Sequence, residues 1–349
     1  MQLKSSSFVS IAASIVLLSG ASRAQQAAPQ SLASTFVEID ERRLVQLTLN
    51  RIDLDYVSLV ARDASDDATS GAPSTVLTAP ALALQLQGGL TAVQNADGTW
   101  SAAASFLGGF STELYVWRFE LEPREGGGFA RSELLGTTLV RDVSFLTPDQ
   151  VERKARDIEA PCLFRAGAVT MVAASVFPLD RTSEVSERVV VVFPLAKKPV
   201  SAQLARLVTH GADPKVVRQG DSTLLAVRRP SNVPEAFGEA RLAFLRSNDL
   251  VAWTEDELLG SATAQPAYSI AIHGGALWLA TWNDLANPRV VVRSFDERRG
   301  NWASDGGIGE CLYRGTPASD GVWFRPSARA NERRPMLLYA CRNGSIARD

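Results

Sequence analysis

The feature that most constrains the fold is a repeated pair of apolar runs separated by a polar turn. Four pairs fill the second half of the chain: 167–176 with 188–193, 221–228 with 241–246, 275–282 with 289–294, and 321–325 with 335–341. They begin at 167, 221, 275 and 321, which are 54, 54 and 46 residues apart. Each run is rich in Val, Leu or aromatic residues and bounded by Gly, Pro, Asn or Asp, which is typical of β-strands. The chain is therefore predicted to consist of repeated strand pairs.

The same rhythm continues more faintly upstream, in runs 43–49 with 56–60 and 100–106 with 113–119. A period of about 50 residues with several strands per unit predicts an all-β fold, a β-propeller of four-stranded blades. At roughly 45 to 55 residues per blade the chain accommodates about six blades. Five or seven are compatible, because the first half is poorly phased. Two β-sandwich domains are the alternative, since they also have short, regularly spaced strands.

The N-terminal segment has the pattern of a secretory signal. Lys4 precedes a short apolar stretch, and Ser22-Arg23-Ala24 forms a small-x-small cleavage site. We therefore expect residues 1–24 to be removed near Ala24, leaving a secreted or periplasmic protein. Residues 25–34 are rich in Ala, Gln and Pro and are predicted to be a flexible lead-in to one propeller domain, 35–349. Two short segments, 149–156 and 201–207, have a helical pattern.

The charge of the mature chain argues against several classes of partner. Without residues 1–24 it has 34 basic and 38 acidic residues, a formal charge of −4. A mildly acidic, mixed surface does not favour nucleic acid or an anionic membrane. No later apolar run is long enough to span a bilayer, and no nucleotide, phosphate-loop or zinc motif occurs. We therefore expect no cofactor and no metal.

The chain has three cysteines, Cys162, Cys311 and Cys341. In an oxidising compartment two of them can form a disulfide, but the odd number leaves one unpaired. Cys311 and Cys341 lie in the last segment and are the candidate disulfide. Three reduced, buried thiols are the alternative.

Three turns combine an Asp with a Trp. Ser294, Asp296, Gly300 and Trp302 follow one apolar run, and Ser247, Asp249 and Trp253 follow another; Asp97, Gly98 and Trp100 form a tighter version. An Asp at a turn accepts hydrogen bonds from nearby backbone amides, and a Trp supplies a large apolar surface. We interpret these residues as structural.

These turns resemble the Asp-box of the sialidase-like, or BNR-repeat, propellers, whose turn reads Ser/Thr-x-Asp-x-Gly-x-x-Trp. In the C-terminal turns the order is kept, but the spacing differs and Gly is absent after Asp249. The resemblance implies turns at the periphery of a propeller, away from an axial pocket. A sialidase-like hydrolase would also have arginines that bind a substrate carboxylate and a Tyr/Glu pair that attacks the sugar.

The residues nearest to that pattern lie in two related strings. Pro161-Cys-Leu-Phe-Arg165 and Glu310-Cys-Leu-Tyr-Arg314 share a Cys-Leu-aromatic-Arg core. We interpret them as equivalent positions in two blades, each entering its first strand. The resemblance makes Arg165 and Arg314 candidate ligands for an anionic sugar, and Tyr313 with Glu310 the candidate catalytic pair. Arginines that cover apolar surface with their stems are the alternative.

Two function classes follow from these observations. The first is a module that binds a glycan or a protein, because the hydrolase motifs are absent or displaced. The second is a sialidase-like glycoside hydrolase acting on an anionic sugar. A structural component of a cell envelope is a third class. The sequence leaves the oligomeric state open.

Overall fold

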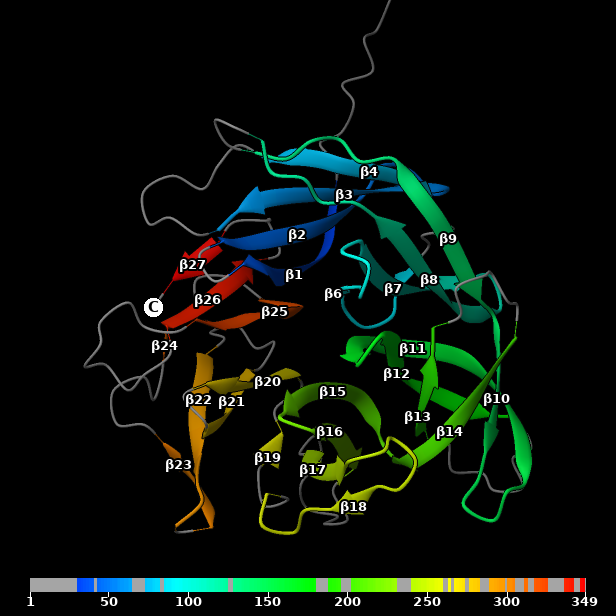
Figure 1. Ribbon diagram of the computed structural model, residues 1–349, viewed down its shortest axis with the longest axis vertical. Helices are drawn as coiled ribbons and strands as arrows, with labels where there is room; N and C mark the ends of the chain where they lie inside the picture. Colours follow the sequence, from blue (N-terminus) through cyan, green and yellow to red (C-terminus); the bar gives the residue numbers. More distant parts are fainter. Residues whose placement is uncertain are drawn as a thin grey trace, which may run out of the picture.

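A computed structural model of the chain consists of β-strands joined by turns (Figure 1). It describes residues 30–40, 43–64, 73–81, 85–124, 128–179, 188–195, 202–230, 240–259, 263–264, 267–273, 276–282, 289–298, 300–304, 311–312, 317–325, 336–341 and 346–348. Within these ranges no helix is long and apolar enough to cross a membrane.

The strands form sheets that follow one another along the chain. The first sheet holds β1 (Gln30–Asp40), β2 (Arg43–Arg51), β3 (Tyr56–Asp63) and β4 (Ser74–Pro80). The second holds β5 (Gln85–Leu86), β6 (Thr91–Gln94), β7 (Trp100–Gly108), β8 (Ser111–Phe119) and β9 (Leu134–Val140). Both β5 and β6 pair with β7, so together they take the place of one inner strand.

The third sheet closes on itself. It holds β10 (Asp142–Leu146), β11 (Glu152–Ala166), β12 (Val169–Pro178), β13 (Val189–Pro194) and β14 (Ala202–His210). β10 pairs with β11 and also, in parallel, with β14. The long strand β11 pairs with β10 through its first residues and with β12 along the rest of its length. Its register with β12 shifts twice, between Arg156 and Cys162. A β-bulge of this kind bends a strand and redirects its side chains.

The last three sheets contain the C-terminal repeats. The fourth holds β15 (Ala212–Gln219), β16 (Ser222–Pro230), β17 (Ala240–Ser247), β18 (Thr254–Glu255) and β19 (Thr263–Ala264). The fifth holds β20 (Ala267–His273), β21 (Ala276–Trp282), β22 (Arg289–Asp296), β23 (Asn301–Ser304) and β24 (Cys311–Leu312). The sixth holds β25 (Pro317–Arg325), β26 (Met336–Cys341) and β27 (Ile346–Arg348).

These sheets are arranged as a ring, which is the architecture of a β-propeller. Figure 1 shows β1, β6, β11, β15, β20 and β25 nearest to the centre. Each of these inner strands contacts the next along the chain, and β25 contacts β1, which closes the ring. The predicted all-β propeller is therefore confirmed. The prediction of about six four-stranded blades is wrong: five sheets have four or more strands, whereas β25–β27 has three in the described residues.

Both faces of a blade are buried, which explains why the strands have continuous apolar runs. In β8, Tyr115 and Trp117 pack toward the first sheet, whereas Leu114 and Val116 pack toward the third. Further clusters join the third sheet to the fourth and the fourth to the fifth. Since successive side chains of a strand point to opposite faces, a strand between two neighbours is apolar at nearly every position.

The apolar runs predicted as strands are strands, but two other predictions fail. Segment 149–156 is a turn followed by the start of β11, and 201–207 lies largely in β14. Pairing with neighbouring strands outweighs their helical pattern. In addition, β1 begins at Gln30, inside the expected lead-in, and Ser34 is buried.

Candidate functional site

The two ends of the ring differ in their side chains. Because neighbouring strands in a blade are antiparallel, the starts of the inner strands and the hairpins joining second to third strands share one end. We call it the entry end; it includes Thr112, 157–159, Arg188 and 213–215. The opposite end, here the exit end, includes Arg165, Arg218 and the hairpins joining third to fourth strands.

Two aspartates occupy left-handed backbone positions at the entry end. Asp157 has a φ of 55° and Asp213 a φ of 54°. Asp157 Oδ1 accepts a hydrogen bond of 2.8 Å from the Thr112 amide of the preceding blade. The Asp213 amide donates to Ser175 Oγ at 2.9 Å, again in the preceding blade. Asp tolerates this conformation better than most residues, and such positions persist where their surroundings hold them.

Glu159 lies two residues after Asp157 and forms an ion pair with Arg188. Arg188 Nη2 is 2.9 Å from Glu159 Oε2, and the side chains are 41% and 16% exposed, respectively. Burial raises the pKa of Glu159 above its usual value, although Arg188 acts in the opposite direction; Asp157 adds to the rise. The Arg188 guanidinium lies 4.8 Å from the Phe177 ring centre, a cation–π contact. Glu159 is therefore a largely buried carboxyl group held next to an arginine whose position is fixed by Phe177.

Asp213 and Lys215 add a second pair of opposite charges. Lys215 Nζ lies 3.3 Å from Asp213 Oδ1, and both side chains are largely buried. The hydroxyl of Tyr268 lies within hydrogen-bond distance of the Asp213 carbonyl and of the Ala226 carbonyl, the latter at 3.0 Å, and its single proton is shared between them. Tyr268 belongs to the next blade, so two neighbouring blades fix the Asp213 backbone.

A third acidic group near this end combines a glutamate, a tyrosine and an arginine. Arg141 Nε donates to Glu113 Oε1 at 2.8 Å, and the Tyr115 hydroxyl donates to Glu113 Oε2 at 3.2 Å. Tyr115 is buried and stacks on Trp117. The sequence prediction missed this Tyr/Glu pair because its members lie inside an apolar strand. Tyr115 faces the core, so it is placed to orient Glu113.

The predicted ligand residue Arg165 lies at the exit end, at the end of inner strand β11. Its string was expected to enter a first strand and to be equivalent to 310–314. In the structure 161–165 forms the second half of β11, whereas Cys311–Leu312 pairs with β22, the third strand of its blade. The two strings are therefore not equivalent. Glu310, Tyr313 and Arg314 lie outside the described residues, as do the side chains of Cys311 and Cys341.

The Asp249 and Asp296 turns both join the third strand of a blade to the fourth. Asp249 Oδ1 accepts hydrogen bonds from the amides of Val251 and Ala252 at 2.8 and 2.9 Å. These bonds hold the pKa of Asp249 below its usual value. Asp296 Oδ1 accepts one from the Arg298 amide at 3.0 Å. Both carboxylates are bound to amides of their own turn.

The tryptophans after these turns pack into the core. The Trp302 ring lies 5.5 Å from both Phe244 and Phe295, and its Nε1 donates to the Leu259 carbonyl at 3.0 Å. Trp253 packs against the cluster between the third and fourth sheets.

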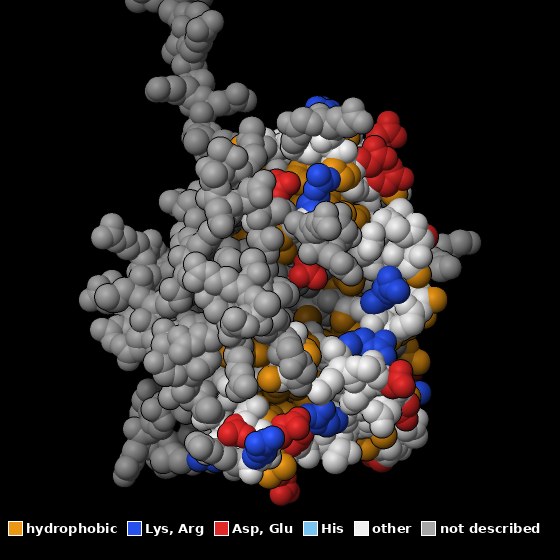
Figure 2. All heavy atoms as spheres, turned by 60° about the vertical axis from the view of Figure 1, so that its left-hand side comes forward, with side chains coloured by type: hydrophobic (Ala, Val, Ile, Leu, Met, Phe, Trp, Pro, Cys, Tyr) orange, Lys and Arg blue, Asp and Glu red, His pale blue; other side chains and the backbone are white. Residues whose placement is uncertain are grey.

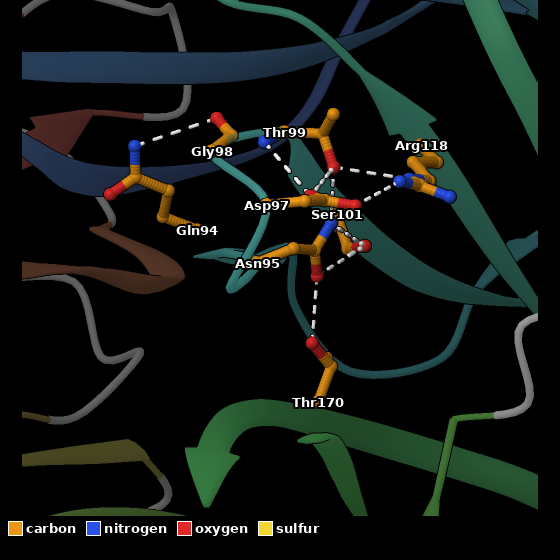
Figure 3. Close-up of polar contacts among 8 residues, drawn as sticks. All are labelled: Gln94, Asn95, Asp97, Gly98, Thr99, Ser101, Arg118 and Thr170. Carbon is orange, nitrogen blue, oxygen red and sulfur yellow. Dashed lines mark hydrogen bonds and ion pairs between the residues drawn. The ribbon is translucent and has the colours of Figure 1, made fainter. Parts of the chain in front are cut away.

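The Asp97 turn lies elsewhere, because it joins the first strand of its blade, β6, to the second, β7. Figure 3 shows Thr99 and Arg118 directed at Asp97, with which both interact. Thr170 reaches from the next blade to Asn95 Oδ1 at 2.7 Å. Trp100 follows and is buried. Asp97 therefore shares the chemistry of the other two turns but not their position.

Neither positive nor negative charge dominates the described part of the face drawn in Figure 2. Figure 2 shows basic and acidic side chains interspersed with apolar ones over the described part of one face. Among the described residues no group of three or more His, Cys, Asp or Glu side chains could hold a metal ion.

Comparison with known proteins relates the chain to sialidases through its fold. No family model and no curated protein matches the sequence. Trypanosoma rangeli sialidase in complex with sialic acid has a TM-score of 0.54 and 9% identity, over 89% of this chain and 52% of that one. The same sialidase with the inhibitor DANA has a TM-score of 0.53 and 11% identity, over 89% and 53%. The chain thus spans about half the length of these sialidase chains. At such identities the likeness shows a shared propeller fold.

Proposed function

We propose that the protein is a secreted carbohydrate-binding β-propeller that holds its ligand at the entry end of the ring. The observation that carries the proposal is the Glu159–Arg188 pair, which presents a half-exposed guanidinium beside a largely buried carboxylate. Charged groups with fixed geometry bind sugar hydroxyls well, because their hydrogen bonds are stronger than neutral ones. The fold shared with a sialidase supports a carbohydrate rather than another small ligand.

The surroundings of this pair favour a binding site over a structural ion pair. Asp157, Asp213 and Lys215 lie at the same end, and two of these residues have a left-handed backbone. A titratable group with a perturbed pKa, which here is Glu159, and backbone strain are both features of functional sites. Bonds from Thr112, Ser175 and Tyr268 hold this end in place before any ligand arrives, which reduces the entropic cost of binding.

The proposal is tested with a glycan array followed by calorimetry, with sialic acid as the first probe. Glu159→Gln and Arg188→Gln should each weaken binding of an array hit about tenfold or more, because each leaves a charged partner unpaired. Asp256→Asn is the matched control: Arg246 and Asp256 form a 2.7 Å pair of similar exposure, 39% and 18%, at the exit end. It should bind as the wild type does. Capture of a protein partner without any glycan hit would contradict the proposal.

A glycoside hydrolase is the second candidate, and the raised pKa of Glu159 specifically favours it. A carboxyl group whose pKa is raised by burial holds its proton to a higher pH than an ordinary glutamate, as a general acid acting on a glycosidic oxygen requires. Asp157, two residues earlier, is the nearby carboxylate, and its Oδ1 accepts a hydrogen bond from the Thr112 amide at 2.8 Å.

Release of fluorophore from synthetic glycosides, including a sialoside, tests this candidate. Turnover that Glu159→Gln abolishes and Asp256→Asn leaves unchanged would establish catalysis at the entry end. Binding of a glycan without turnover of its glycosides would leave the binding function and exclude this one.

A further inference from the structure

The exit end carries two arginines, Arg165 and Arg218, in equivalent positions of neighbouring blades. Each sits near the end of an inner strand, followed by a two-residue turn that begins with a glycine in the left-handed region: Gly167 has a φ of 62° and Gly220 a φ of 60°. Arg165 pairs in register with Thr170, and Arg218 with Thr223. The two segments therefore share the pattern Arg-x-Gly-x-x-Thr, 53 residues apart.

Backbone carbonyl groups position both guanidinium groups. Arg165 Nε donates to the carbonyl of Gly167 in its own turn at 3.1 Å. Arg218 Nη1 donates across the blade boundary to the carbonyl of Arg165 at 3.3 Å. The Arg218 head group thus lies against the strand end that bears Arg165. The Arg165 bond uses Nε alone, which leaves the two Nη groups available.

The two arginines lack the acidic partners that other arginines at this end have. Arg118 pairs with Asp97, and Arg246 with Asp256. In the described residues neither Arg165 nor Arg218 forms an ion pair, and both are exposed. A bound anion would supply the negative charge that these two guanidinium groups lack among the described residues.

We propose that Arg165 and Arg218 form a binding site for an anionic group, a carboxylate, a sulfate or a phosphate. A guanidinium is planar and offers paired N–H donors that match the oxygen atoms of such groups. The equivalent positions direct two of these forks from adjacent inner strands to the same end of the ring. The site is separate from the entry end and does not depend on the carbohydrate proposed there.

The test titrates the whole protein with sulfate, phosphate and acetate at constant ionic strength. Binding is followed by calorimetry and by NMR of the arginine Nε–Hε signals. Saturable binding is expected for at least one anion, with the Arg165 and Arg218 signals shifted. Arg165→Gln and Arg218→Gln should each weaken it about tenfold. Arg118→Gln, which removes an exposed arginine already paired with Asp97, should change nothing.

The three anions also separate the sources of the ligand. Preference for acetate indicates a carboxylate, as in an acidic sugar or a peptide terminus, whereas preference for sulfate or phosphate indicates an ester of that acid. Absence of saturable binding to all three anions would overturn the proposal, as would unchanged affinity in the folded double variant. If a variant fails to fold, the wild-type NMR titration decides the matter: shifts confined to arginines other than Arg165 and Arg218 would overturn the proposal.

Discussion

Tyr268→Phe tests whether contacts between blades hold the entry end together. Tyr268 is fully buried, and its hydroxyl lies within hydrogen-bond distance of the carbonyls of Asp213 and Ala226 in the neighbouring blade, which share its single proton. Its removal leaves both carbonyl groups buried without this donor, while the aromatic ring continues to fill its space. The hydroxyl has a single proton, so one shared hydrogen bond is lost and a buried carbonyl oxygen loses its donor. Leaving a buried acceptor unsatisfied costs about 1–3 kcal/mol, and the free energy of unfolding should fall by about that amount.

Urea unfolding followed by tryptophan fluorescence measures this change. Tyr56→Phe is the matched control, because the Tyr56 side chain is exposed and the substitution is chemically identical; its effect should stay within about 0.5 kcal/mol. The argument would be refuted if Tyr268→Phe were as mild as the control, since the blades would then not depend on this contact. We also expect Tyr268→Phe to weaken glycan binding, because the Asp213 backbone loses one of its two hydrogen bonds to neighbouring blades.

Three further predictions follow from local geometry and titration. Gly88→Ala should cost about 2 kcal/mol or more, because a Cβ there would lie 2.5 Å from Ala160 Cα and φ is +100°, whereas Gly136→Ala, with open space around it, should be nearly neutral in the same urea assay. Asp249 has a lowered pKa in the folded state. Its contribution to stability is therefore present above the pKa of the unfolded state and is lost as the pH falls through the pKa of the folded state. The difference in free energy of unfolding between wild type and Asp249→Ala should shrink in acid. Glu159 has a raised pKa in the folded state, so the wild-type protein gains stability as the pH falls through that pKa. Glu159→Gln lacks this gain, so the free energy of unfolding of the variant minus that of the wild type should be higher at neutral pH than in acid. A difference that does not change with pH would contradict the assignment.

Much of the fold could be predicted from the sequence because each blade is buried on both faces. The runs 113–119 and 188–193 are apolar at nearly every position, and each becomes a strand between two neighbours. The start of β11 is harder to predict: 152–157 is highly charged and looks helical, yet it pairs with β10 and the end of β12. A long-range partner determines its conformation, and no local pattern records that partner.

The candidate site was less predictable, since its groups are far apart in the chain. Thr112 and Asp157 are separated by 45 residues. Glu159 in β11 forms its ion pair with Arg188, which directly precedes β13, so β12 lies between them in the chain. One local signal was present: Asp157 and Asp213 each stand shortly before the apolar part of an inner strand. The resemblance to sialidases directed attention to Arg165, which lies at the exit end, and to 310–314, outside the described residues.

Hydrogen–deuterium exchange with a bound glycan tests the central claim most directly. The protein is saturated with the array hit, and exchange of backbone amides is compared with that of the free protein. Binding at the entry end predicts slower exchange in segments 111–115, 157–163 and 211–216 and unchanged exchange in 244–256 at the exit end. Protection confined to 244–256, or to the turn at 95–99, would contradict the account.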